Sequence, residues 1–508
     1  MRRVGVHFRS LSRKASAVLA LVIALSTMAA FPQPIRADNQ VPRYEETRCR
    51  FQLPDNYRIR CGNLIVLEDR TKPDGATIAL HVAVVRAKSR NATDDPIVYL
   101  DGGPGGHTLE TLDILLPEFF AKYAVKRDFI LFDQRGVGLS EPALECSELE
   151  YSRIDLLRRA VTEDEANVER NKALQECHDR LVNDGINLAA YNSHENAADL
   201  NDLRTVLGYQ EWNLYGISYG TRLALTAMRD FPEGIRSVVL DSTYPPNAAL
   251  YEDIPSSAAR SFQALFDGCA ANKVCARAFP KLDSVFYTLV KDLNENPVSV
   301  SVSFSKRNFK VVVTGNRVLD TLFDLMYSTS AIPYLPGMIW DIKEGNYDDI
   351  AKRILENNIG TRSIVSTGMY YSVQCQEEVE FSTQAQLDAA DAKYPEQNGT
   401  FSGSNIFKIC QGWGLGRAPA IENKAVSSDI PTLILSGEYD PITPPTYAEM
   451  AAKSLSNAYM FEFPGIGHGV SVSGICPSSI MQQFLENPYR QPSSGCIRKM
   501  KGPDFVTH

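Results

Sequence analysis

The pentapeptide Gly216-Ile217-Ser218-Tyr219-Gly220 has the residue types and spacing of a serine nucleophile. An apolar run precedes it at 212–215, and residue types common in helices follow at 221–228. Glycines beside a serine permit a strained, sharp turn between a strand and a helix, and this turn exposes the hydroxyl. A five-residue pattern also occurs by chance in surface turns. It predicts a nucleophile only if a base, an acid and an oxyanion hole accompany it.

Asp440 is the candidate acid. It follows the apolar run 432–435, and Pro441 and Pro444 stiffen the loop that carries it. Functional loops of parallel sheets gather at the carboxyl ends of the strands, where this position falls. Glu438 is the competing carboxylate, and an aspartate before a proline is also a common turn residue.

His468 is the candidate base. It stands between Gly467 and Gly469, after the last apolar run and 28 residues beyond Asp440. A histidine between glycines has few apolar neighbours to pack against, which favours a functional role over a structural one. His107 and His194 are the other candidates on plausible loops, and both precede the serine.

A glycine-rich segment, 102–106, follows the apolar run 97–100. Its bare backbone N–H groups can approach a substrate closely, so we expect the N–H of Gly103 and that of Tyr219 to form the oxyanion hole. A phosphate-binding loop is the rival interpretation. Pro104 lacks a donor, however, and no Lys-Ser/Thr pair follows.

Eight short apolar runs alternate with helical patterns and predict a mostly parallel, doubly wound α/β sheet. About 190 residues separate the sixth run from the seventh, too many for a simple connection, so we expect a mainly helical cap there. The predicted division is a core part at 38–245, a cap at 246–427 and a second core part at 428–508.

Residues 1–37 have the basic, apolar and small-residue order of a secretory signal peptide, with an uncleaved anchor as the alternative. Removing them deletes six basic side chains and no acidic ones, so the net charge changes from −9 to −9 − 6 = −15. Such an acidic protein is poorly suited to nucleic acids or anionic membranes. We therefore expect a secreted or periplasmic protein that binds neither.

Ten cysteines agree with export to an oxidising compartment. Pairing between sequence neighbours is the simplest proposal, although the sequence alone does not fix connectivity. The predicted pairs are Cys49–Cys61, Cys146–Cys177, Cys269–Cys275, Cys375–Cys410 and Cys476–Cys496. No C-x-x-C motif occurs and the histidines do not cluster, so we expect no metal site. We expect no cofactor either.

Taken together, these segments resemble the secreted tripeptidyl and prolyl aminopeptidases of the α/β-hydrolase serine peptidases. The resemblance rests on 102–106, on Asp-Gln-Arg-Gly-Val-Gly-Leu-Ser at 133–140, and on the serine, acid and histidine segments. It implies an α/β-hydrolase fold with the chain order serine, acid, histidine, and a C-terminal block like that of tripeptidyl aminopeptidases. One departure is Asp101, where many relatives carry histidine.

The resemblance also implies that peptides are trimmed from a free N-terminus, which requires a carboxylate in the cap for the substrate ammonium. Glu377 and Glu378 are the candidates, held by the Cys375–Cys410 pair beside Trp413. A solvated acidic pair is the alternative interpretation.

Two other functions stay open. An esterase or a hydrolase of non-peptide amides could use the same triad, since folds do not determine substrates. A catalytically silent binding protein is the third hypothesis. The expected substrate is accordingly a peptide or a small ester or amide.

Overall fold

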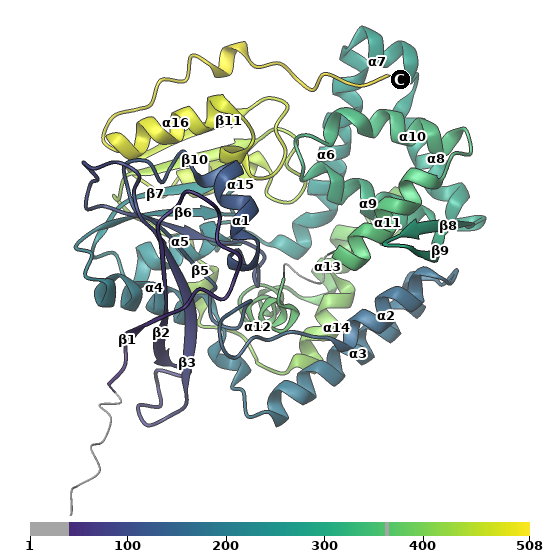
Figure 1. Ribbon diagram of the computed structural model, residues 1–508. Coiled ribbons are helices and arrows are strands. Elements are labelled where there is room, and N and C mark those ends of the chain that lie inside the picture. Colours follow the sequence, from purple (N-terminus) through teal and green to yellow (C-terminus); the bar gives the residue numbers. More distant parts are fainter. Residues whose placement is uncertain (1–39, 361–364, 508) are drawn as a thin grey trace, which may run out of the picture. The chain divides into compact units, whose positions relative to one another are not determined.

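A nine-stranded β-sheet forms the centre of the structure, a computed structural model that describes residues 40–360 and 365–507 (Figure 1). The strands are β1 (Arg43–Thr47), β2 (Ile59–Leu67), β3 (Thr77–Val85), β4 (Ile97–Leu100), β5 (Phe129–Phe132), β6 (Trp212–Ile217), β7 (Ile235–Asp241), β10 (Thr432–Gly437) and β11 (Ala458–Phe463). Their spatial order is β1-β2-β3-β5-β4-β6-β7-β10-β11. The predicted signal segment, 1–37, lies outside the described residues.

Six strands of the sheet, from β5 to β11 in that order, run parallel to one another. The other three, β1 to β3, are antiparallel and occupy one edge. The predicted α/β fold is confirmed, and the count of eight strands is corrected to nine. The missed strand is β1, a polar edge strand whose residues Arg43, Glu45 and Glu46 give no apolar signal.

Helices cover both faces of the parallel strands. On one face α4 (Ser193–Leu207), α5 (Tyr219–Asp230) and α15 (Pro445–Ala452) pack against Leu214 and Ile434. On the other, α1 (Leu112–Leu115) and α16 (Ile475–Glu486) pack against the alternate strand residues, such as Leu433. Burial on both faces explains why these strands have continuous apolar runs. None of the helices in the described residues is long and apolar enough to span a membrane.

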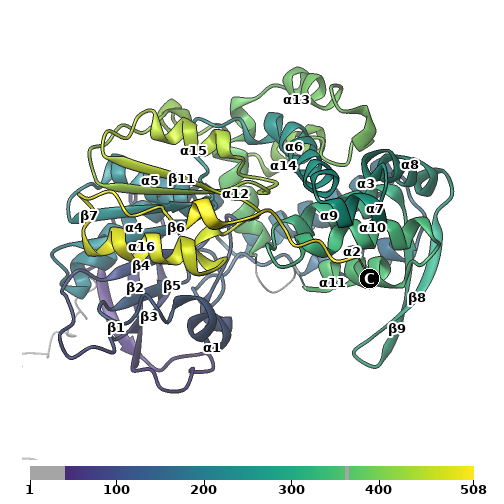
Figure 2. The same ribbon diagram turned by 90° about the horizontal axis from the view of Figure 1, so that it is seen from above.

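The chain between β7 and β10 is mostly helical and contains one hairpin, as the sequence predicts (Figure 2). Its elements are α6 (Leu250–Ala271), α7 (Lys273–Ala278), α8 (Leu282–Glu295), β8 (Val298–Phe304), β9 (Arg307–Val313), α9 (Gly315–Met326), α10 (Leu335–Lys343), α11 (Asp348–Gly360), α12 (Thr367–Glu377), α13 (Gln384–Asp391) and α14 (Ser404–Trp413). A second excursion, between β5 and α4, contains α2 (Glu148–Leu157) and α3 (Glu163–Asn183).

All five predicted disulfides are present, and none of the ten cysteines is left unpaired. The Cys375–Cys410 bridge joins α12 to α14, and Cys146–Cys177 joins α3 to the chain before α2. Each bridge closes a loop of the unfolded chain, which typically contributes about 2–4 kcal/mol to stability.

Candidate active site

Ser218 occupies the turn between β6 and α5, at the carboxyl end of a central parallel strand. Its backbone angles are φ 59° and ψ −127°, a strained conformation for a residue other than glycine. Two residues later, position 220 requires glycine, because a Cβ there would lie 2.0 Å from the carbonyl oxygen of Leu100. The chain therefore folds as the glycine pattern predicts, and it holds a partly buried serine at the start of a helix.

His468 and Asp440 lie on the loops that follow β11 and β10, two neighbouring parallel strands. The Nδ1 of His468 is 2.8 Å from Oδ2 of Asp440. Asp440 is fully buried and acts only as an acceptor when ionised, so this contact places the imidazole proton on Nδ1. The unprotonated Nε2 is then available as a base.

The loop around Asp440 supplies further donors to its carboxylate. The Thr443 hydroxyl donates to Oδ2 at 2.7 Å, and the Thr443 N–H donates to Oδ1 at 2.9 Å. Burial alone would raise the pKa of Asp440, but the charge of His468 and these hydrogen bonds hold it below the ordinary value. Asp440 is thereby kept ionised beside the imidazole.

Burial lowers the pKa of His468, and the charge of Asp440 with its hydrogen bond more than offsets this, so the pKa lies above the ordinary value. The imidazole also packs against the ring of Tyr327, with centroids 4.9 Å apart. The N–H of His468 donates to the Tyr327 carbonyl oxygen at 3.0 Å. The end of α9 thus orients the histidine, a contact that no sequence pattern indicates.

Glu438, the competing acid, does not contact the histidine. Its carboxylate accepts from the N–H of Gly465 at 2.8 Å instead. Arg260 of α6 donates to the carbonyl oxygens of both Glu438 and Asp440, so the inserted segment fixes the acid loop.

Asp241, at the end of β7, connects the serine turn to the histidine loop. Its carbonyl oxygen accepts from the N–H of Ser218 at 3.0 Å, and its carboxylate accepts from the N–H groups of Val470 and Ser471. Among the described residues, His468 has hydrogen bonds to Asp440 and Thr443 and none to the Ser218 hydroxyl. A bond between nucleophile and base commonly tightens only when substrate is bound.

The glycine-rich loop after β4 lies against the serine. A Cβ on Gly102 would be 2.9 Å from the Cβ of Ser218, so only glycine fits this approach. Within the described part of the chain, the N–H groups of Gly103 and Tyr219 donate to no protein acceptor. Free N–H groups beside a serine are what an oxyanion hole requires.

Asp101, the departure from the family pattern, braces this loop. Its carboxylate accepts from the N–H of Gly102 at 2.8 Å and from the Thr108 hydroxyl. Asp133 acts similarly in the next loop, where it accepts from the N–H groups of Thr108, Leu109 and Leu139. Carboxylates thus fix the backbone on both sides of the predicted oxyanion hole.

Glu377 and Glu378 are not placed to receive a substrate. They are 1% and 4% exposed, and both pair with the buried Arg222 of α5, Glu377 at 3.1 Å. Glu377 also accepts from the N–H and hydroxyl of Ser193, each at 2.6 Å. The prediction of a substrate-binding pair is corrected on this ground: one guanidinium already lies between the carboxylates, and they join α12 to the serine helix.

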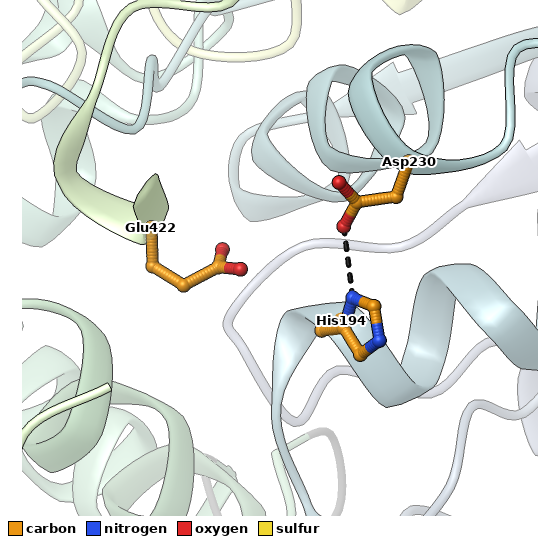
Figure 3. Close-up of side chains that lie close together, drawn as sticks. All are labelled: His194, Asp230 and Glu422. Atoms are coloured by element: carbon orange, nitrogen blue, oxygen red, sulfur yellow. Dashed lines mark hydrogen bonds and ion pairs between the residues drawn. The ribbon is translucent and has the colours of Figure 1, made fainter. Parts of the chain in front are cut away.

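The two alternative histidines lie in other surroundings. His107 is buried, with Nδ1 3.5 Å from Glu110. Figure 3 shows His194 bonded to Asp230 at 2.8 Å, with Glu422 close to both.

The group His194, Asp230 and Glu422 has donor types that suit zinc. Arg229, however, bonds both carboxylates: it is 2.6 Å from Asp230 and 2.6 Å from Glu422. A cation therefore already neutralises this group, which is an ion-pair cluster between α4, α5 and the chain before β10.

Two adjoining cavities, of about 620 and 790 Å³, lie between the inserted segment and the α2–α3 excursion. Asp320 and Asp324 of α9 line both cavities, and neither forms an ion pair within the described residues. Burial raises the pKa of each, and the charge of Asp320 raises that of Asp324 further. Tyr327, which packs on His468, follows Asp324 by one helical turn, and Ile442 of the acid loop lines the larger cavity. The cavities thus bring acids with raised pKa values close to the catalytic candidates, and Arg153, Arg170 and Arg317 line the smaller one as well.

A model of the alpha/beta hydrolase fold matches residues 95–474. The serine protease Hip1 of Mycobacterium tuberculosis is 26% identical over 460 residues, covering 85% of this chain and 86% of that protein. A tripeptidyl aminopeptidase of Streptomyces coelicolor is 29% identical over 208 residues, 40% of this chain and 38% of that one. Carboxylesterase B of Mycobacterium tuberculosis is 25% identical over 486 residues, 90% of each chain.

The residues matched by the family model, 95–474, include the six parallel strands, the serine turn, Asp440 and His468. The chain belongs to the alpha/beta hydrolase family.

Proposed function

We propose that this protein is an exported serine aminopeptidase that removes short fragments, of tripeptidyl or prolyl type, from the free N-terminus of peptides. The observation that carries the proposal is the 2.8 Å contact between His468 and Asp440, on loops that Asp241 connects to the Ser218 turn. Nucleophile, base and acid in this chain order and on these strand ends are the parts of a serine hydrolase.

In the proposed reaction, Ser218 Oγ attacks the carbonyl carbon while its proton passes to Nε2 of His468. Asp440 holds the imidazole in the required tautomer and stabilises the imidazolium. The N–H groups of Gly103 and Tyr219 bind the oxyanion. The imidazolium then protonates the leaving amine, and water hydrolyses the acyl-enzyme by the same steps.

Specificity for a free N-terminus is supported by the acid-lined cavities. Asp320 and Asp324 form no ion pair within the described residues, and both have raised pKa values, although the charge of Arg170 partly lowers that of Asp320. An ammonium group brought between them would favour their ionised forms and attract them, which an acetylated N-terminus cannot do. They take the place of the predicted Glu377 and Glu378.

Export is supported by five disulfides, which persist in oxidising compartments, and by the signal-like order of residues 1–37. Sequencing the N-terminus of protein recovered from the medium or periplasm tests this part. A mature chain that begins near residue 38 is the expected result, whereas retention of an intact chain in the cytoplasm contradicts export.

The experiment for specificity is a peptide library with free N-termini, compared with its acetylated counterpart by mass spectrometry. Release of short N-terminal fragments from the free library alone is expected. The alternative function, supported by the similarity to carboxylesterase B, is an esterase. Rapid turnover of short acyl esters without cleavage of either library would favour the esterase.

A further inference from the structure

Asp241 is a fully buried carboxylate between the serine turn and the histidine loop, and the proposed reaction gives it no role. Its Oδ1 accepts from the N–H of Val470 at 2.7 Å, and its Oδ2 accepts from the N–H of Ser471 at 2.8 Å and from the Ser471 hydroxyl. Two successive N–H groups just after His468 are therefore held by one carboxylate.

The next residue, Ser242, extends this arrangement. Its hydroxyl accepts from the N–H of Gly469 at 2.9 Å, and its φ is 55°. A positive φ at a residue other than glycine costs about 1 kcal/mol or more and persists only where other contacts enforce it. Together, Asp241 and Ser242 take up every backbone N–H from Gly469 to Ser471.

The charge of Asp241 has no cation to balance it in the described residues, since none of its contacts is a lysine or arginine. The ionisable groups around it are Tyr99, Tyr123, Tyr215 and His468. Burial raises the pKa of all three tyrosines well above the ordinary value, so they stay neutral. The imidazole of His468 is the one group in this set that becomes a cation when it takes up a proton.

We propose that Asp241 is a positioning residue for His468. It clamps the loop that carries the imidazole, and it supplies a second negative charge beside Asp440. The proposal rests on the proposed role of His468 as the base. A buried acceptor with donors fixed around it resists reorganisation, so its field acts on the imidazolium as soon as that ion forms.

Other groups face His468 from the elements that pack against its loop. Asp440 and Thr443 face it from the loop after β10, and Tyr327 from the end of α9. Arg260 bonds the carbonyl oxygen of Asp440. None of these groups bonds the Asp241 carboxylate, so replacing Asp241 by asparagine removes its charge and one acceptor of the loop N–H groups without removing a direct contact of the imidazole.

The test is the rate at which a fluorophosphonate labels Ser218, measured from pH 5 to 9, because this reaction needs the base and no particular substrate. Asp241→Asn should shift the acid limb of the profile to lower pH, by roughly 0.5–1 units, and lower the plateau rate about tenfold. Ser471→Ala removes one donor and keeps the charge. It should slow labelling with the limb in its wild-type place.

Asp128→Asn is the matched control. Asp128 is also buried and accepts from a backbone N–H, that of Ala87 at 2.9 Å, but it precedes β5 at the amino ends of the parallel strands, whereas His468 follows β11 at their carboxyl ends. The acid limb of the labelling profile of Asp128→Asn should stay at its wild-type pH. An unmoved limb in a folded Asp241→Asn protein would overturn the proposal. If that variant does not fold, a shifted limb in Ser471→Ala would overturn it. Wild-type protein that is never labelled at Ser218 would instead contradict the proposed function itself.

Discussion

The Nδ1 of His468 and Oδ2 of Asp440 are 2.8 Å apart, and Thr443 holds the same carboxylate oxygen at 2.7 Å. A hydrogen bond within its own loop thus holds the acid in the position from which it orients the base. Both loops start from adjacent parallel strands, so the separation of the two side chains is set by the spacing of the sheet.

Asp440→Asn should reduce kcat by about 10⁴, since an amide can stabilise the wrong imidazole tautomer; this is the scale seen in the well-studied triad proteases. Glu438→Gln is the matched control, because its carboxylate lies two residues away and bonds Gly465. Kinetics on a single chromogenic substrate checks both. Equal losses in the two variants would show that Asp440 is not the acid.

The kcat/KM of the wild-type enzyme should fall on the acid side with an apparent pKa above 6.5, the ordinary value for histidine. The reason is that Asp440 raises the pKa of His468, and only the neutral imidazole can accept the serine proton. Activity is therefore lost as pH falls through that raised value. A pH profile from 5 to 9 measures it, and an acid limb well below 6.5 would contradict the electrostatics described.

Replacing both Asp320 and Asp324 by asparagine should raise KM about tenfold for peptides with a free N-terminus, and should leave acetylated peptides or esters unaffected. Asp388→Asn is the control, because Asp388 is an exposed aspartate that bonds Gln384 and Ser404. Steady-state kinetics on the matched substrates decides. An unchanged KM for free peptides would remove these residues from substrate recognition.

Arg222→Met should lower the free energy of unfolding by about 3–5 kcal/mol, because it leaves Glu377 and Glu378 buried without a cation. Arg159→Met breaks an exposed ion pair with Glu169 and should leave the free energy of unfolding almost unchanged. Denaturant unfolding of both variants provides the measurement. Similar denaturant midpoints for the two variants would show that the buried ion pairs of Arg222 contribute no more to stability than the exposed pair does.

The turn at Ser218 and the neighbouring positions of Asp440 and His468 could be predicted because each residue stands within a short, local pattern at the end of an apolar strand. Ser218 stands between two glycine-containing steps of a sharp turn, and His468 stands directly between Gly467 and Gly469. All five disulfides join cysteines that are neighbours in the order of cysteines along the sequence, so they too could be predicted. These features depend on residues close together in the sequence.

Other features depend on contacts between distant segments. Glu377 looked available because its partner Arg222 is 155 residues away. Asp320 and Asp324 have the spacing of a solvated helix face, and only the packing of α9 places them beside a cavity. Asp241 ends a strand like many others, and its role depends on the loop at 469–471.

The most direct test of the account compares wild-type and Ser218→Ala protein on a matched pair of chromogenic amides, a tripeptidyl amide with a free N-terminus and the same compound acetylated. We expect wild-type protein to cleave the free compound at least tenfold faster in kcat/KM. Ser218→Ala should lose about 10⁶ in kcat. Equal cleavage of both compounds, or activity that survives the substitution, would contradict a serine aminopeptidase centred on Ser218.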